Sequence, residues 1–285
     1  MPSGMMTTQP FSFPPPFSLP DKERAHLLAF ADRLADAARD AILPHFRRAA
    51  LAVDDKRPAG QFDPVTEADR AAERAMRALI EETYPDHGIE GEEYGVKSSG
   101  SGWSWVLDPV DGTRAFIAGL PLWGTLIGLT FEERPVIGII DQAYLGERFR
   151  GWPGGADVID RHGQRPLRVR DCADLRDAVA ATTDVHLFNP SEAGAFEMVR
   201  RTAKLTRYGC DCYAYAMLAS GHIDLVVESG LKPHDVAGLI PVIEGAGGIV
   251  ANWRGEPAWR GGQVIAGGDR RPIESALVAL RRSAD

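Results

Sequence analysis

Hydrophobic residues between positions 22 and 46 recur every three or four residues, which is the spacing of an amphipathic helix. Asp21 precedes them and is a favourable N-cap. A polar stretch over residues 54–64 contains Pro and Gly and predicts a loop. A second helix is predicted over 66–84, because Thr66 begins a capping box with an aspartate at its fourth place. The ordered chain is therefore expected to begin with two helices.

The middle of the chain changes to short apolar segments of strand length. Residues 123–131 and 135–144 flank a polar turn and predict a hairpin. Further strands are predicted over 103–107, 147–152 and 156–160. The acidic stretch 84–94 has little apolar surface and is typical of a solvated loop. We therefore expect an antiparallel sheet after the two helices.

In the second half of the chain, strands and helices alternate. Strands are predicted over 178–182, 223–228, 249–251 and 263–266. Helices are predicted over 191–202, 211–220, 235–244 and 272–282. Such alternation indicates a layered α/β half. The expected division is an α+β half over 21–160 and an α/β half over 161–285.

Residues 1–20 are rich in Pro and Phe and carry almost no charge. They lack the basic start and continuous apolar core of a signal peptide. Proline at this density disfavours helix and central strand, so a mobile tail is predicted. No 18 apolar residues run without interruption, so no membrane span is expected.

The overall charge restricts the partners. The 285 residues have a formal net charge of -8, a sign that repels nucleic acid and anionic lipid. At 44% hydrophobic, the chain can form a sizeable core. Its three cysteines, an odd number, are expected to be reduced thiols in a cytoplasmic protein.

The string WVLDPVDGT over residues 105–113 carries the clearest chemistry. An apolar strand ends at Asp108, and Asp111 follows three residues later on a turn fixed by the intervening proline. The two carboxylates can point at one spot, and the carbonyl of Val110 can face the same way. Hard oxygen ligands of this kind suit Mg²⁺. The free N–H groups at Gly112 and Thr113 begin a helix-like stretch and predict an adjacent phosphate site.

Three other acids are ambiguous when each is taken alone. Glu92 lies in a GEE string that is typical of a solvated loop. Asp235 and Asp69 both lie at helix starts, where aspartate is usually a cap. A bridging carboxylate is what a metal pair would need, and Glu92 is separated from Asp108 by one short strand.

Four strings in this order resemble the inositol monophosphatase superfamily: DPVTEAD over 63–69, GEE over 91–93, WVLDPVDGT over 105–113 and HDVAG over 234–238. The chain looks closest to the histidinol-phosphate phosphatase branch, because of the segments 111–128, 138–148, 206–215 and 226–235. The resemblance implies an αβαβα sandwich, often dimeric. It also implies two or three Mg²⁺ ions and a small phosphorylated metabolite as substrate.

The resemblance also implies a role for each matching residue. Metal ligands would be Glu92, Asp108, the Val110 carbonyl, Asp111 and Asp235, with Asp69 at a weaker third site. Gly112 and Thr113 would bind phosphate, and Glu92 and Thr113 would orient the attacking water. Thr66 would act beside Asp69. Substrate contacts would come from Arg114, Asp211, Glu228 and His234.

Two positions depart from the superfamily. His234 stands where the inositol enzymes usually have Trp, and it is expected to touch the substrate. The spacing of the histidines predicts no metal triad. The stretch 56–63 is about two residues longer than in those enzymes, so no role is carried onto Lys56.

Histidinol phosphate has an amine and an imidazole, both of which can be cationic, and two acids, Asp211 and Glu228, suit that charge. An inositol, nucleoside bisphosphate or fructose bisphosphate phosphatase is the alternative, with Arg114, Arg207 and Lys232 as possible cations for a second phosphate. A remote alternative is a regulator that binds metal and phosphate without turnover.

Overall fold

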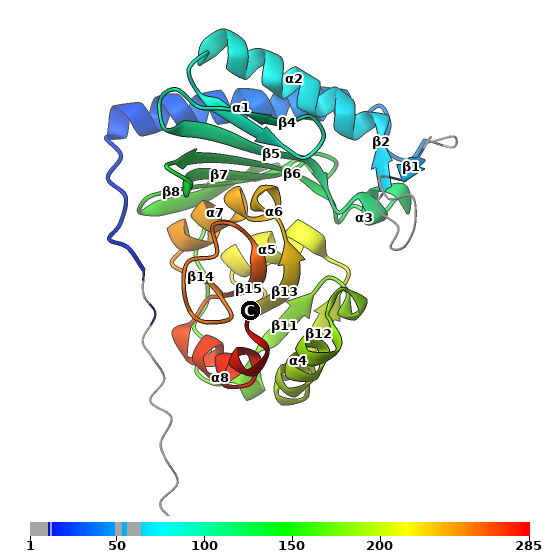
Figure 1. The fold of residues 1–285 in the computed structure, drawn as a ribbon, viewed down its shortest axis with the longest axis vertical. Coiled ribbons are helices and arrows are strands. Elements are labelled where there is room, and N and C mark those ends of the chain that lie inside the picture. Colours follow the sequence, from blue (N-terminus) through cyan, green and yellow to red (C-terminus); the bar gives the residue numbers. More distant parts are fainter. Residues whose placement is uncertain (1–10, 12, 49–52, 56–63) are drawn as a thin grey trace, which may run out of the picture.

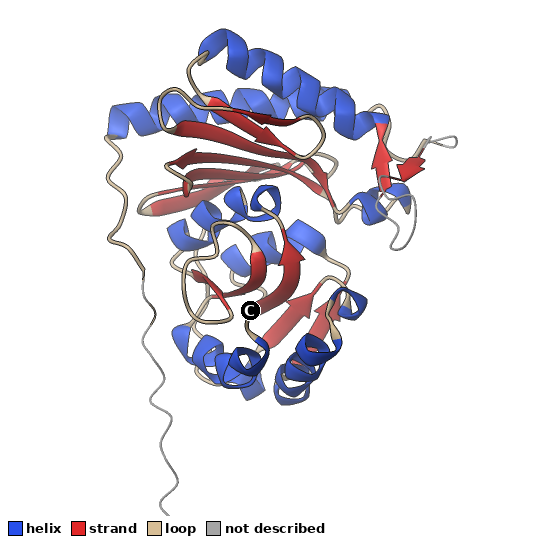
Figure 2. Ribbon diagram, in the orientation of Figure 1, coloured by secondary structure: helices blue, strands red, loops and turns tan. Residues whose placement is uncertain are grey.

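The computed structural model describes residue 11 and residues 13–48, 53–55 and 64–285. These residues form five layers: two helices, a large sheet, three helices, a smaller sheet and two helices (Figure 1). Figure 2 shows the alternation of helix and sheet. The predicted αβαβα sandwich is confirmed. Buried apolar side chains fill the space on both faces of each sheet, in three clusters.

The outer helices α1 (Asp21–Ile42) and α2 (Glu67–Thr83) cover one face of the large sheet (Figure 1). The first helix ends four residues before the predicted Phe46 and continues as turns, although Phe46 remains buried. The predicted capping box of the second helix is confirmed, because Thr66 Oγ1 accepts the N–H of Ala68 and Asp69 accepts the N–H of Thr66.

The large sheet is mostly antiparallel, with strand order β10-β9-β8-β7-β6-β5-β3-β4. Its strands are β3 (Gly88–Gly91), β4 (Gly95–Lys97), β5 (Trp103–Asp111), β6 (Gly124–Phe131), β7 (Arg134–Gln142), β8 (Glu147–Trp152), β9 (Gly155–Asp160) and β10 (Gly163–Pro166). The predicted hairpin 123–144 is confirmed as β6 and β7. The sheet extends to Pro166, and the division of the chain at residue 160 stays a prediction.

The loop predicted over 84–94 is wrong, because strand β3 lies there and pairs in parallel with β5. Ile89 is fully buried, and the backbone of β3 finds its hydrogen-bond partners on β5 and β4. Tertiary pairing therefore overrides the acidic composition of this stretch. Strands β1 (Val53–Asp55) and β2 (Pro64–Thr66) also pair where a loop was expected, and residues 56–63 lie outside the described residues.

The smaller sheet has the order β12-β11-β13-β15-β14. Its strands are β11 (Val179–Thr182), β12 (Leu205–Tyr208), β13 (Leu225–Leu231), β14 (Ile249–Asn252) and β15 (Gly262–Gly267). Its outer face is covered by α4 (Pro190–Thr202) and α8 (Arg270–Leu280). The sequence did not predict β10 and β12. Both are polar edge strands, which lack the apolar alternation that indicates a half-buried strand.

Three helices fill the middle layer: α5 (Asp211–Ala219), α6 (Pro233–Ala237) and α7 (Leu239–Gly245). The single helix predicted over 235–244 is therefore two short helices that meet at Gly238. A Cβ on Gly238 would lie only 3.0 Å from the Ile139 carbonyl oxygen, so the joint lies directly on the large sheet. The remaining short helices are α3 (Thr113–Ile117) and the 3₁₀ turns Leu175–Asp177, Val185–Leu187 and Arg281–Ser283.

A row of glycines makes room for α6 and α7. Gly128, Gly138 and Gly151 are register partners across β6, β7 and β8. A Cβ on Gly138 would lie 2.2 Å from the carbonyl oxygen of Gly238, and one on Gly151 would lie 2.2 Å from the backbone of Pro241. The backbones of α6 and α7 can therefore contact the backbone of the sheet directly, because the strands carry no side chains at these positions.

The described part of the Pro/Phe segment contacts the body of the protein. The ring centroid of Phe17 lies 6.0 Å from that of Trp103 and 5.8 Å from that of Phe131. Arg134 Nη1 donates to the carbonyl oxygen of Pro15 at 2.7 Å. The mobility expected of residues 1–20 stays a prediction. In the described part of the chain, no helix has the length and apolar character needed to cross a membrane.

Candidate active site

An irregularity at the end of β5 brings its two aspartates together. Asp108 pairs with Leu126 of β6 and Asp111 pairs with Gly124, so β5 has one residue more than β6 between these pairs. In a regular strand, residues three apart point to opposite faces. The extra residue, a β-bulge, turns both carboxylates to the same side. Asp108 is 2% exposed, and its Oδ1 accepts the N–H of Val110 at 3.1 Å.

A first group of possible ligand atoms joins β5 to α6. Carboxylate oxygens of Asp108, Asp111 and Asp235 all lie within 4.8 Å of one another. Asp235 is held at the start of α6, where it accepts the N–H of Lys232 at 2.6 Å. Asp111 accepts the N–H of Cys212 at 2.6 Å, in the first turn of α5. Two helix starts and one strand end therefore converge on these three acids.

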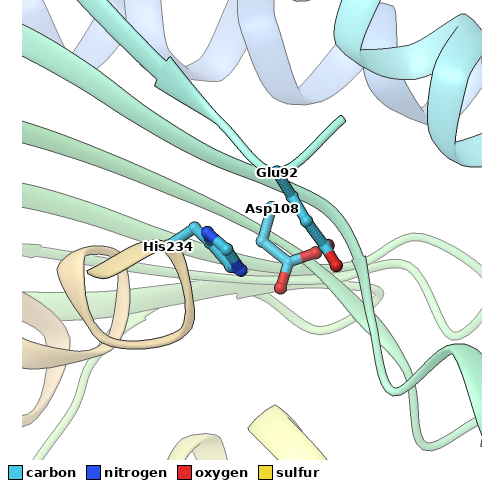
Figure 3. Close-up of side chains that lie close together, drawn as sticks. All are labelled: Glu92, Asp108 and His234. Carbon is cyan, nitrogen blue, oxygen red and sulfur yellow. The ribbon is translucent and has the colours of Figure 1, made fainter. Parts of the chain in front are cut away.

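A second group shares Asp108 with the first. Oxygens of Glu92 and Asp108 and a ring nitrogen of His234 also lie within 4.8 Å of one another. Glu92 directly follows β3, and its N–H donates to the carbonyl of Leu107 at 3.2 Å. Figure 3 shows the imidazole of His234 directed toward the two carboxylates. The sequence placed His234 near the substrate and did not predict that it would meet Glu92 and Asp108.

Burial and mutual repulsion raise the pKa values of these acids. The pKa of Asp108 is well above its usual value, first because of burial and then because of Glu92, Asp111 and Asp235, and a hydrogen bond with Glu92 adds to the rise. Burial, followed by Asp211 and Asp235, likewise raises the pKa of Asp111. Several buried carboxylates at such distances are costly unless they share protons or bind a cation. The donor set, mostly hard oxygens, fits a divalent metal ion.

This arrangement gives stability a pH dependence that a cation should remove. In chelator-treated protein, we expect the free energy of unfolding to fall as the pH rises above about 4, the ordinary pKa of aspartate. In that range the folded protein retains protons on Asp108, Asp111 and Asp235 that the unfolded chain has lost, because their folded-state pKa values are raised. Urea unfolding at several pH values, with and without a divalent cation, measures the effect. A stabilisation by the cation that does not grow with pH would contradict it.

Asp69 and Thr66 lie at the start of α2 and form a buried pair. Asp69 Oδ2 accepts from Thr66 Oγ1 at 2.5 Å and from its N–H at 2.9 Å. Burial raises the pKa of Asp69 against the effect of these hydrogen bonds, and the charge of Glu92 adds to the rise. Asp69 therefore lies near Glu92 but belongs to neither of the two ligand groups. The structure supports its capping role, and its metal role stays a prediction.

The predicted phosphate site follows the bulge. Gly112 has a φ of 83°, a left-handed conformation that favours glycine, and α3 begins at Thr113. Thr113 Oγ1 donates to the carbonyl of Val110 at 3.0 Å. This carbonyl oxygen has a second lone pair, so the bond leaves it able to accept another interaction.

A cleft of about 280 Å³ lies beside the first group, and four acids line it: Asp111, Asp211, Glu228 and Asp235. Glu228 comes from β13 and accepts the Thr183 N–H at 2.7 Å and its hydroxyl at 2.9 Å. Burial raises the pKa of Glu228 to about 8 and that of Asp211 to about 6. The sequence prediction that these two acids share a site is thus supported by their position.

Two of the basic side chains that were expected near the substrate, Arg114 and Arg207, do not line the cleft. Arg114 Nη1 lies 3.6 Å from Asp184 Oδ2, and its charge opposes the rise in the pKa of Asp211, but it does not line the cleft. Arg207 is exposed on the edge strand β12. The lining also includes residues that were not predicted as site residues, among them the polar Thr183 and Tyr215, because neither belongs to a motif that a single sequence reveals.

Comparison with known proteins agrees with this geometry. The inositol monophosphatase family matches residues 23–284. The bifunctional phosphatase IMPL2, chloroplastic, of Arabidopsis thaliana is 41% identical over 276 residues, which cover 93% of this chain and 78% of that protein. A histidinol-phosphatase of Chlorobaculum parvum is 34% identical, with 89% and 96% covered.

A solved structure of an inositol monophosphatase from Zymomonas mobilis has a TM-score of 0.80 and 43% identity, and the match covers 90% of this chain and 98% of that one. The match to the family spans all of the acids described above. Members of this family depend on metal ions for activity. The chain therefore belongs to the inositol monophosphatase family and is a phosphomonoester hydrolase.

Proposed function

We propose that this enzyme hydrolyses histidinol phosphate to histidinol and phosphate, with Mg²⁺ as its metal. The substrate proposal rests on the acid-lined cleft, in which Glu228 and Asp211 lie beside the metal-binding candidates Asp111 and Asp235. Relatives named histidinol-phosphatases, such as that of Chlorobaculum parvum, support the same substrate.

The charge of the cleft favours a cationic substrate. Both Glu228 and Asp211 have raised pKa values because burial disfavours their ionised forms. A bound ammonium or imidazolium group would stabilise the ionised forms and gain a charge-assisted hydrogen bond. A neutral polyol would receive hydrogen bonds there but no ion pair. The cleft should therefore discriminate between phosphate esters by the charge of their alcohol part.

We assign the metal ligands from the two groups and from the backbone near the bulge. The ligands are Glu92, Asp108, the Val110 carbonyl, Asp111 and Asp235, with Asp69 and Thr66 at a weaker third site. Bound Mg²⁺ would lower the pKa of a water molecule and neutralise charge on the phosphate and the leaving oxygen. The separations within the two groups, and the raised pKa values of their acids, support this assignment.

Phosphate binding and activation of the water would be carried out by backbone and side-chain groups of the protein. The N–H groups of Gly112 and Thr113 would hold a phosphate oxygen, since both lie at the start of α3, where backbone N–H groups have no partner within the helix. Glu92 would accept a proton from the attacking water, and the Thr113 hydroxyl would orient that water. To do so, the hydroxyl would exchange its present bond to the Val110 carbonyl for one to the water.

Inositol phosphate is the second candidate, because a protein of known structure with 43% identity is an inositol monophosphatase. Bisphosphates are less favoured, since Arg114 lies next to Asp184 and Arg207 lies on an exposed edge strand. Membership of a family of hydrolases argues against the regulator without turnover.

The test is phosphate release with Mg²⁺ over four esters: histidinol phosphate, inositol 1-phosphate, adenosine 3′,5′-bisphosphate and fructose 1,6-bisphosphate, with a chelator as control. We expect histidinol phosphate to lead by about a hundredfold in kcat/KM, or roughly 2.7 kcal/mol of transition-state preference. A higher kcat/KM for inositol 1-phosphate would show that the proposed substrate is wrong, without contradicting the assignment of the metal ligands.

Glu228→Gln should lower kcat/KM for histidinol phosphate about tenfold more than for inositol 1-phosphate. The amide oxygen can still accept the two hydrogen bonds from Thr183, so the variant removes the charge and keeps the contact. Steady-state kinetics on both substrates with one enzyme preparation gives the ratio. Equal losses on the two substrates would show that the charge does not select the alcohol.

A further inference from the structure

His234 places a nitrogen donor in a metal site that is otherwise built from oxygens. A ring nitrogen lies within 4.8 Å of oxygens of both Glu92 and Asp108, and Figure 3 shows the ring directed at them. The superfamily resemblance predicts Trp at this position, which has no lone pair to offer. This nitrogen is therefore a feature of the present sequence.

The imidazole is buried and makes few other contacts with polar groups. His234 is 9% exposed. Its Nε2 lies 3.6 Å from Asp235 Oδ1, which is longer than a hydrogen bond. Among the described residues, no hydrogen bond joins either ring nitrogen to the protein. A buried imidazole that makes no hydrogen bond with the described residues and is directed at two carboxylates can offer a lone pair to a metal ion.

Two features of the fold fix its position. His234 is the second residue of α6, which begins at Pro233, and Asp235 follows it. The two adjacent residues therefore belong to different ligand groups. Asp235 lies close to Asp108 and Asp111, whereas His234 lies close to Asp108 and Glu92. Because α6 rests on the glycine row, neither side chain can retreat from the sheet without moving the helix.

We propose that Glu92, Asp108 and His234 form a mixed oxygen–nitrogen site that prefers a divalent transition-metal ion, of the Fe²⁺, Co²⁺ or Zn²⁺ class, to Mg²⁺. Mg²⁺ favours oxygen ligands and parts reluctantly with its water, whereas imidazole suits the later first-row metals. The first group, with three carboxylates, keeps the character of a Mg²⁺ site. The enzyme would thus hold two chemically different ions that share Asp108.

This inference deepens the metal assignment of the proposed function, and it is independent of the substrate. It is tested by binding alone, with Co²⁺ as the probe and no phosphate ester present. If the enzyme proves to act on a different ester, the Co²⁺ result is unaffected. If Co²⁺ does not bind through His234, the phosphatase activity with Mg²⁺ can still be measured.

The first experiment is a titration of chelator-treated protein with Co²⁺, followed by visible absorption, and with Mg²⁺, followed by calorimetry. His234→Phe should weaken Co²⁺ binding by about tenfold or more, since even the loss of a residue behind a ligand costs that much. Its Mg²⁺ affinity should change far less. His222→Phe, at an exposed histidine, is the matched control and should bind Co²⁺ as the wild type does.

The second experiment is proton NMR of the Co²⁺-loaded wild type and of the same two variants. A histidine that binds Co²⁺ shows an exchangeable ring N–H proton far outside the normal proton NMR range. We expect one such resonance in the Co²⁺-loaded wild type, present in His222→Phe and missing in His234→Phe. Its absence from the wild type, or equal losses of Co²⁺ and Mg²⁺ affinity in His234→Phe, would overturn the proposal.

Discussion

Asp108→Asn is expected to lower kcat/KM by about a thousandfold or more, or at least roughly 4 kcal/mol of transition-state stabilisation. Asp108 is the residue that both ligand groups share, so its loss weakens two metal positions at once. The amide oxygen of Asn can still accept the Val110 N–H, so the bulge that Asp108 closes should persist. Steady-state phosphate release at saturating Mg²⁺ measures the loss.

The same variant should be more stable than the wild type when metal is removed. Glu92, Asp111 and Asp235 all disfavour ionised Asp108, and Asn removes that repulsion. We expect a higher Tm for Asp108→Asn than for the wild type in chelator at pH 7, and the reverse order with Mg²⁺. Asp86→Asn, on an exposed loop, is the control for both readouts. Activity above about a tenth of wild type would contradict the assignment of Asp108.

Gly138→Ala is expected to destabilise the protein by about 3 kcal/mol, the upper part of the range for overpacking. The added methyl would meet the carbonyl oxygen of Gly238 at 2.2 Å, and a backbone atom cannot rotate away as a side chain can. The joint between α6 and α7 must then lift from the sheet. Because α6 carries His234 and Asp235, metal affinity should fall as well as stability.

Gly194→Ala is the matched control, since it makes the same chemical change in a helix with open space around the new methyl. Alanine has the better helix propensity, so this variant should gain about 0.5–1 kcal/mol. Urea unfolding of both variants and calorimetric Mg²⁺ titration measure the contrast. A Gly138→Ala protein with unchanged stability would show that the helix layer is less tightly seated than the structure indicates.

The part of the site that comes from one short segment could be predicted from the sequence. Asp108, Asp111 and Gly112 lie within five residues, so their chemistry can be read from one string. The bulge that turns the two carboxylates to one side was not predictable, since it depends on how β5 pairs with β6. The approach of His234 to Glu92 was hidden for the same reason, because it is set by the packing of α6 on a distant part of the chain.

Elements with a clear apolar period were predicted well, and exceptions have physical causes. β3 is acidic, but its backbone is completed by two neighbouring strands. The break at Gly238 within the predicted helix 235–244 follows from its contact with the large sheet. Periodicity reports which face of an element is buried, and it does not report what lies opposite that face.

The order of synthesis gives the shared site a further consequence. The chain leaves the ribosome from its N-terminus, so β3 and β5 are made long before α6. A nascent chain that ends before Pro233 already holds Glu92, Asp108 and Asp111, but it lacks His234, Asp235 and the two helices α6 and α7 that rest on the glycine row of the large sheet. Such a chain has incomplete ligand groups and an uncovered apolar surface. Capture of a metal ion is therefore expected to come late, and it marks the moment at which both halves have folded.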